Sequence, residues 1–128
     1  LLTSNSLNSN LMKFINARVH SIIDYLVVIF LSFAPSIFDL PELSTTFAYI
    51  LAVVHLLLTI LTYFKFGVIK LISFPLHGVI ELLVSFALVG LAFYLGIEEG
   101  TLARNFYLGF AIAVFLTWLF TDYKSASS

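Results

Sequence analysis

The chain has 128 residues, of which 61% are apolar and only 10% are charged, and its formal net charge is −1. A soluble domain averages about 45–50% apolar and about 25% charged residues, because it needs a charged surface to stay dissolved. The composition therefore excludes an ordinary water-soluble domain, and the lack of a basic surplus argues against a nucleic-acid partner.

The N-terminal stretch differs in composition from the rest of the chain. Residues 1–11 are rich in Ser and Asn and precede the only methionine, Met12. We expect residues 1–11 to be a disordered or non-native extension and residues 12–128 to form a single domain.

Charged residues divide the domain into four apolar segments. A charged side chain at bilayer depth costs a few kcal/mol, so charges mark the ends of membrane spans. Each segment is close to the roughly 20 residues that a spanning helix needs, and uninterrupted apolar runs of this length do not suit paired strands. We predict transmembrane helices at about residues 18–38, 45–64, 75–96 and 102–121. The expected fold is all-α, a four-transmembrane-helix bundle.

Basic residues predict the orientation of these helices. One side of the membrane receives five of them, namely Lys13, Arg18, Lys65, Lys70 and Lys124, and the other receives Arg104. Because basic loops stay in the cytoplasm, we expect a multi-pass protein of the bacterial inner (plasma) membrane with both termini cytoplasmic.

Two parts of the sequence match each other. His20-Ser-Ile-Ile-Asp24 aligns with His77-Gly-Val-Ile-Glu81, and the helix ends beginning at Thr62 and Thr121 align at nearly the same offset. The match predicts two tandem helical hairpins that enter the membrane from the same side and are related by a pseudo-twofold axis along its normal.

The matched positions carry ionisable side chains. In each copy a histidine precedes an acid by four residues, which places both side chains on one helix face. We expect a polar, protonatable cluster of His20, Asp24, His77, Glu81, Tyr63 and Asp122, which Tyr123 can join. Such a cluster can sense or pass protons, since histidine titrates near neutral pH. Alternatively, these side chains snorkel to the headgroups at the helix ends and have no function.

The same residues admit two cofactor interpretations. His20 and His77 on separate helices could be axial ligands of a haem, which would make a redox protein. His20, Asp24, His77 and Glu81 also match the four ligands of a zinc ion. Neither interpretation has a further signature, and no nucleotide-binding or hydrolase motif is present. We therefore expect no cofactor, no metal and no catalytic residue.

Two sets of residues are predicted to pack helices together. Gly109, Ala113 and Thr117 recur every four residues, which brings small side chains onto one face where another helix can approach closely. His55 lies in the middle of the second segment with no carboxylate expected beside it. We predict that it hydrogen-bonds to a neighbouring helix in a packing role.

Three short stretches resemble the SPW-repeat proteins, small bacterial integral membrane proteins built from tandem two-helix repeats. The stretches are residues 17–25, residues 75–81 and Thr121-Asp122-Tyr123, although Ala34-Pro35-Ser36 stands where the first Ser-Pro-Trp signature would be. The resemblance implies the tandem architecture and no enzymatic activity.

These observations predict a small non-enzymatic structural or interaction component of the membrane or of a membrane complex. Its expected partners are membrane lipids and either further copies of itself or a larger membrane complex. The alternative is proton-linked transport or pH sensing through the paired His and acid residues, and a haem-binding redox protein is a third possibility.

Overall fold

The computed structural model describes residues 13–125, so the predicted extension at residues 1–11 and its boundary at Met12 lie outside the described residues. Every regular element in this range is a helix: α2 (Ala17–Ile37), α3 (Glu42–Leu61), α4 (Phe74–Glu99) and α5 (Thr101–Leu119). All four helices are long and apolar enough to cross a membrane. The prediction of an all-α protein with four helices of membrane-spanning length is confirmed.

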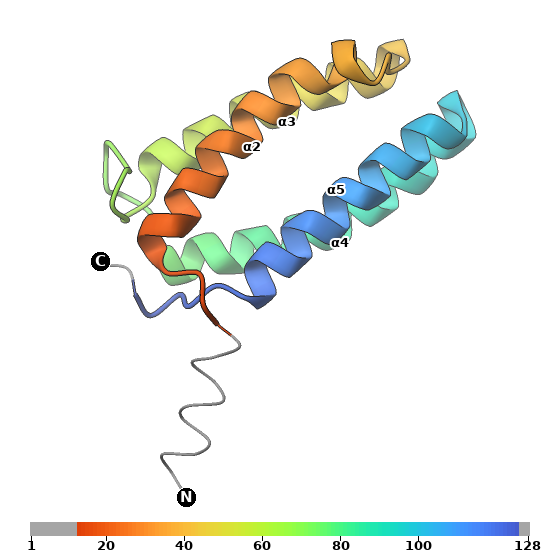
Figure 1. Cartoon of the computed structure of the whole chain (residues 1–128). Coiled ribbons are helices and arrows are strands. Elements are labelled where there is room, and N and C mark those ends of the chain that lie inside the picture. The colour runs from red at the N-terminus through yellow and green to blue at the C-terminus, as the bar shows by residue number, and fades with distance from the viewer. Residues whose placement is uncertain (1–12, 126–128) are drawn as a thin grey trace, which may run out of the picture.

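The helices pack mainly in two pairs, α2 with α3 and α4 with α5 (Figure 1). The start of α2 and the end of α5 lie at the same end of the bundle as the 62–73 connection (Figure 1). Short backbone bridges join the segments there: Ile15 N donates to Phe120 O at 3.0 Å, and Tyr63 N donates to Ile72 O at 2.7 Å. These bridges fix the positions of Thr62 and Thr121, which are residues of the site described below.

Side-chain caps define the starts of α2 and α4. The Asn16 side chain accepts from Val19 N at 2.9 Å, and the Ser73 hydroxyl accepts from Leu76 N at 3.3 Å. Each cap satisfies a backbone N–H that has no partner within its helix. The caps thereby place His20 and His77 at the same height in the first turns of their helices.

A carboxylate from α4 caps the start of α3. Pro41 offers no side-chain cap, and Glu99 accepts instead from Leu43 N at 2.7 Å, Ser44 N at 2.6 Å and Ser44 Oγ at 2.6 Å. With this cap α3 starts at Glu42, earlier than the predicted residue 45, and α4 continues to Glu99, past the predicted residue 96. The contact connects the two helix pairs at the end opposite the bridges.

The outward faces of the helices are apolar. Large side chains on them are more than half exposed, among them Leu26 (58%), Phe33 (61%), Leu83 (63%) and Phe86 (63%). A soluble monomer rarely exposes apolar patches of this extent, whereas hydrocarbon solvates them without cost. The four helices are thus compatible with a small multi-pass membrane protein.

The predicted packing stripe of Gly109, Ala113 and Thr117 lies on the side of α5 that lines two hollows beside α2. Gly109 and Ala113 are exposed, and a Cβ on Gly109 would meet no heavy atom within 4 Å. The opposite side of α5 faces the core instead, because Tyr107 there is fully buried and its hydroxyl donates to Ser44 O at 2.7 Å. Gly109 therefore packs against no other helix of the described chain, and the packing role of the stripe stays a prediction.

Candidate functional site

Two residues of α2 and two of α4 form a buried cluster, which we call the His/acid cluster: His20, Asp24, His77 and Glu81. Their exposed fractions are 0%, 1%, 0% and 4%. Each histidine Nε2 lies close to oxygens of both carboxylates. The Nε2 of His20 is 3.3 Å from Asp24 Oδ1 and 3.2 Å from Glu81 Oε2, and that of His77 is 3.1 Å from Asp24 Oδ2 and 3.5 Å from Glu81 Oε1. The repeated His-x-x-x-acid pattern thus brings both pairs to one point.

Threonine hydroxyls hold the other nitrogen of each ring. His20 Nδ1 lies 2.9 Å from Thr121 Oγ1, and His77 Nδ1 lies 2.8 Å from Thr62 Oγ1. Each hydroxyl donates its single hydrogen to the carbonyl four residues earlier, Thr62 to Leu58 O at 2.6 Å and Thr121 to Thr117 O at 2.5 Å. The hydroxyls must therefore accept from the rings, so the Nδ1 atoms of both histidines carry a hydrogen. A neutral ring then has its lone pair on Nε2, facing the carboxylates, whereas a ring that also donates from Nε2 is doubly protonated. His20 Nε2 is within hydrogen-bond distance of Glu81 Oε1, at 3.3 Å.

Tyr123 joins the cluster from the segment after α5. Its hydroxyl donates to Glu81 Oε2 at 2.7 Å, and burial, together with the nearby Glu81 charge, raises the pKa of this phenol well above its ordinary value. Tyr123 is therefore a permanent hydrogen-bond donor. The lack of a side chain at Gly78 makes room for its ring, since a Cβ there would lie 2.9 Å from Tyr123 ring carbons.

His55 of α3 also reaches the cluster. Its Nε2 is 3.4 Å from Asp24 Oδ1, and its side chain is 15% exposed. The expectation that no carboxylate lies beside His55 was wrong, because the packing of α3 along α2 turns this face of α3 toward Asp24. Nothing in the spacing of the α3 residues alone indicates this contact.

Two predicted members do not join the cluster. Tyr63 is 50% exposed, and Lys70 Nζ lies 5.1 Å from its ring centroid. Asp122 Oδ1 accepts from Lys124 N at 3.1 Å. Their neighbours Thr62 and Thr121 are the residues that make contact. The alignment of these two threonines between the copies was the signal that could have identified them.

Aromatic rings cover the cluster on the side of the helix ends. Phe64 and Phe74 are both fully buried, with centroids 5.5 Å apart. The Phe74 ring is 5.2 Å from the His20 ring and 4.7 Å from the Tyr123 ring. The cluster side chains point into the bundle beneath this cover, so the interpretation in which they snorkel to the headgroups was wrong.

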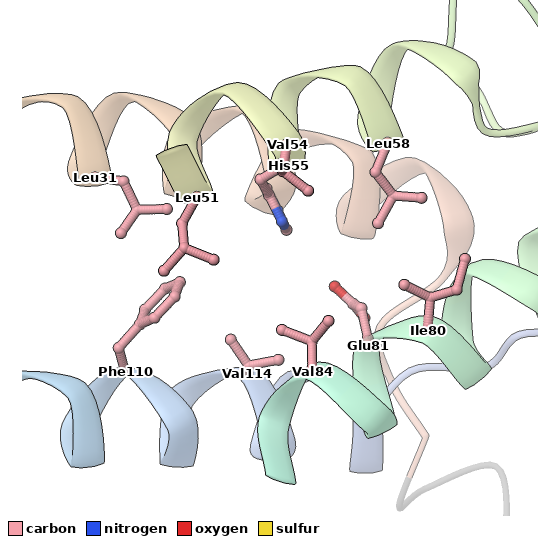
Figure 2. A pocket seen from close by; sticks show the side chains of 10 residues that line it. All are labelled: Leu31, Leu51, Val54, His55, Leu58, Ile80, Glu81, Val84, Phe110 and Val114. Atoms are coloured by element: carbon pink, nitrogen blue, oxygen red, sulfur yellow. The ribbon is translucent and has the colours of Figure 1, made fainter. Parts of the chain in front are cut away.

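A small cavity lies beside the cluster, between the α2/α3 and α4/α5 pairs. Its volume is about 60 Å³, and His55 and Glu81 point into it from opposite walls (Figure 2). The rest of the lining is apolar and includes Leu51, Leu58 and Val84. A second cavity of about 30 Å³ touches Asp24 from the side of α2 and α5. These volumes suit an ion or a few water molecules.

A haem does not fit this arrangement. The ring centroids of His20 and His77 are only 5.2 Å apart with the rings nearly perpendicular, and both rings are fully buried. A porphyrin plane would have to lie between two rings that already contact each other. The donor set of imidazoles and carboxylates instead suits a single metal ion.

Comparison with known proteins finds no matching family, no matching curated protein and no matching solved structure. We therefore infer the function from the geometry of the site.

Proposed function

We propose that this chain is a small multi-pass protein of the bacterial inner membrane that acts as a non-enzymatic structural or interaction component, with both termini cytoplasmic. The proposal rests on the apolar outward faces of all four helices and on the burial of the His/acid cluster between them. A protein of this form presents helix faces, rather than a soluble domain, to its partners.

We further propose that the bundle consists of two tandem hairpins of the SPW-repeat type. The hydrogen-bond pattern supports this proposal, since His20 of the first copy bonds to Thr121 of the second, and His77 of the second bonds to Thr62 of the first. Exchange of equivalent positions about a pseudo-twofold axis would give this pattern. His55 departs from the symmetry, because the aligned position in the second copy is Val114.

The observation that carries the interaction role is the unoccupied small-residue stripe on α5. Gly109 and Ala113 line an open groove between α2 and α5, together with Val27, Phe30 and Phe106. Small residues let the backbones of two helices approach closely in lipid. We propose that a helix of a second copy occupies this groove, so the chain forms a homo-oligomer.

Co-purification of two differently tagged copies from one membrane tests this proposal. Gly109→Leu should reduce recovery of the second tag by about tenfold or more, since it fills the groove where two backbones would meet. Gly90→Leu is the matched control because Gly90 is also exposed and its Cβ would also meet nothing within 4 Å. Equal recovery from wild type and Gly109→Leu would refute self-association through this face.

The proton-transport alternative finds less support. In the part of the chain that the structure describes, apolar side chains line the larger cavity except at His55 and Glu81, while polar side chains line nearly half of the smaller one. Beyond His55 and Glu81, the apolar walls of the larger cavity offer no hydrogen-bonding group to continue a proton path. Liposomes containing the protein and a pH-sensitive dye should therefore show the proton flux of empty liposomes, and a flux abolished by His20→Ala would contradict this.

A further inference from the structure

We propose that the His/acid cluster binds one divalent transition-metal ion of the zinc class through His20 Nε2, His77 Nε2 and one oxygen each of Asp24 and Glu81. The site would lie in the core where α2 meets α4, at the junction of the two helix pairs.

The spacing of the donor atoms supports this assignment. One ligand atom from each of the four residues lies within 4.8 Å of all the others. The nitrogen-to-oxygen distances are 3.3, 3.2, 3.1 and 3.5 Å. A tetrahedral ion with bonds of about 2.0–2.1 Å separates its ligand atoms by about 3.3–3.4 Å. Each imidazole Nε2 therefore has one oxygen of each carboxylate at about one tetrahedral edge length, although the two rings approach different oxygens. The four groups are thus close enough for small side-chain movements to bring one oxygen of each carboxylate onto a shared ion.

Two of these atoms lack any hydrogen-bond partner. Asp24 Oδ2 and His77 Nε2 are 3.1 Å apart and fully buried, yet neither makes a hydrogen bond to any described residue. Buried polar atoms are nearly always satisfied, so this pair needs an explanation. Binding of one metal ion by both atoms would explain why they lack hydrogen bonds. The lone pairs of Asp24 Oδ2 and His77 Nε2 would then point at the ion and not at each other.

The threonine contacts prepare the rings for coordination. A ligating histidine characteristically donates its second ring N–H to a neighbouring acceptor, which fixes the tautomer and the ring orientation. Thr121 and Thr62 perform this role, since each accepts from Nδ1 and leaves Nε2 as a lone pair. Tyr123 likewise donates to the Glu81 carboxylate and orients it.

The charge also matches. Two carboxylates beside neutral imidazoles carry a charge of −2, which one divalent ion neutralises at this buried position. Without an ion, lone pairs of nitrogen and oxygen would face one another at 3.1–3.5 Å unless both rings gained a second proton. Imidazole donors favour zinc and similar ions over magnesium or calcium. His55 Nε2 lies 3.4 Å from Asp24 Oδ1 without a hydrogen-bond partner, and it stands outside the set of four ligand residues.

Metal analysis of the full chain purified in mild detergent tests the proposal. We expect about one zinc per chain by mass spectrometry, and after chelation we expect Co²⁺ to produce the strong visible absorption of a four- or five-coordinate site. Wild-type protein that is helical and monodisperse, yet takes up neither Zn²⁺ nor Co²⁺, would overturn the proposal and leave doubly protonated histidines as the explanation. This measurement requires no variant to fold.

Conservative variants then locate the site. Asp24→Asn and Glu81→Gln keep the side-chain shape and should weaken Zn²⁺ binding by more than about 100-fold, beyond the effect of outer-shell partners. Asp122→Asn is the matched control, since Asp122 follows α5 near the cluster without joining it, and it should bind as wild type does. Unchanged Zn²⁺ binding in folded Asp24→Asn would overturn the proposal. The oligomer test above is independent, because Gly109→Leu leaves all the ligands in place.

Discussion

The hydroxyl of Thr62 offers a sharp test of how the site is organised. Thr62 is fully buried, and its Oγ1 accepts from His77 Nδ1 at 2.8 Å while donating to Leu58 O at 2.6 Å. Thr62→Val preserves the branched shape and removes this bridge. The Nδ1–H of His77 then loses its partner, which costs about 1–3 kcal/mol for a buried donor unless the ring changes tautomer. In the other tautomer Nε2 is protonated and cannot bind a metal.

The expected result is a 10- to 100-fold loss of Zn²⁺ affinity, roughly 1.4–2.7 kcal/mol, as for other outer-shell partners of ligating histidines. Competition against a chelating dye in detergent measures it. Thr59→Val is the matched control, because Thr59 is equally buried on α3 and its hydroxyl donates to His55 O at 2.7 Å without contacting a ring of the cluster. This control should change the affinity by less than about twofold. Equal losses in the two variants, or no loss in Thr62→Val, would refute the reasoning.

Three further predictions concern the cap, the tyrosine and pH. Glu99→Gln should lower the free energy of unfolding by about 1–2 kcal/mol, because the amide is a weaker cap of α3 and loses the attraction of the carboxylate to the α3 dipole. Glu98→Gln is the control and should have little effect. Thermal unfolding in detergent compares the two variants. Gly78→Ala should displace the Tyr123 ring, which a Cβ would approach to 2.9 Å, and calorimetry should find a lower melting temperature than for Gly90→Ala. Zn²⁺ affinity should fall as the pH falls, because protons compete with the ion for imidazole and carboxylate. Titration calorimetry from pH 8 to about pH 5.5 measures this trend. An affinity that stays constant over this range would contradict the prediction.

The sequence predicts the helices well because apolar length and charge position depend on local composition. It also predicts which His and acid side chains share a helix face, since the four-residue spacing fixes this. Whether that face points inward cannot be read from one helix. Burial of His20 and Glu81 depends on how α2 meets α4, a contact between segments far apart in the chain.

The cluster contacts of Thr62, Thr121 and His55, which the sequence did not predict, also depend on the packing of segments far apart in the chain. Thr62 and Thr121 reach the rings only because backbone bridges at Ile15 and Ile72 hold the helix ends in place. His55 meets Asp24 only through the α2/α3 packing. The partner of the α5 stripe could not be predicted, because small residues indicate a close contact without identifying the partner helix.

Hydrogen exchange of the histidine rings tests the central claim most directly, namely that helices from both pairs enclose a tautomer-locked His/acid cluster. The chain has only three histidines, so ¹⁵N resonances of the protein in lipid bilayers are readily assigned. We predict that the Nδ1–H signals of His20 and His77 persist after transfer to D₂O and disappear selectively in Thr121→Val and Thr62→Val. Rapid loss of both signals in the wild type, at the rate of a free imidazole, would contradict it.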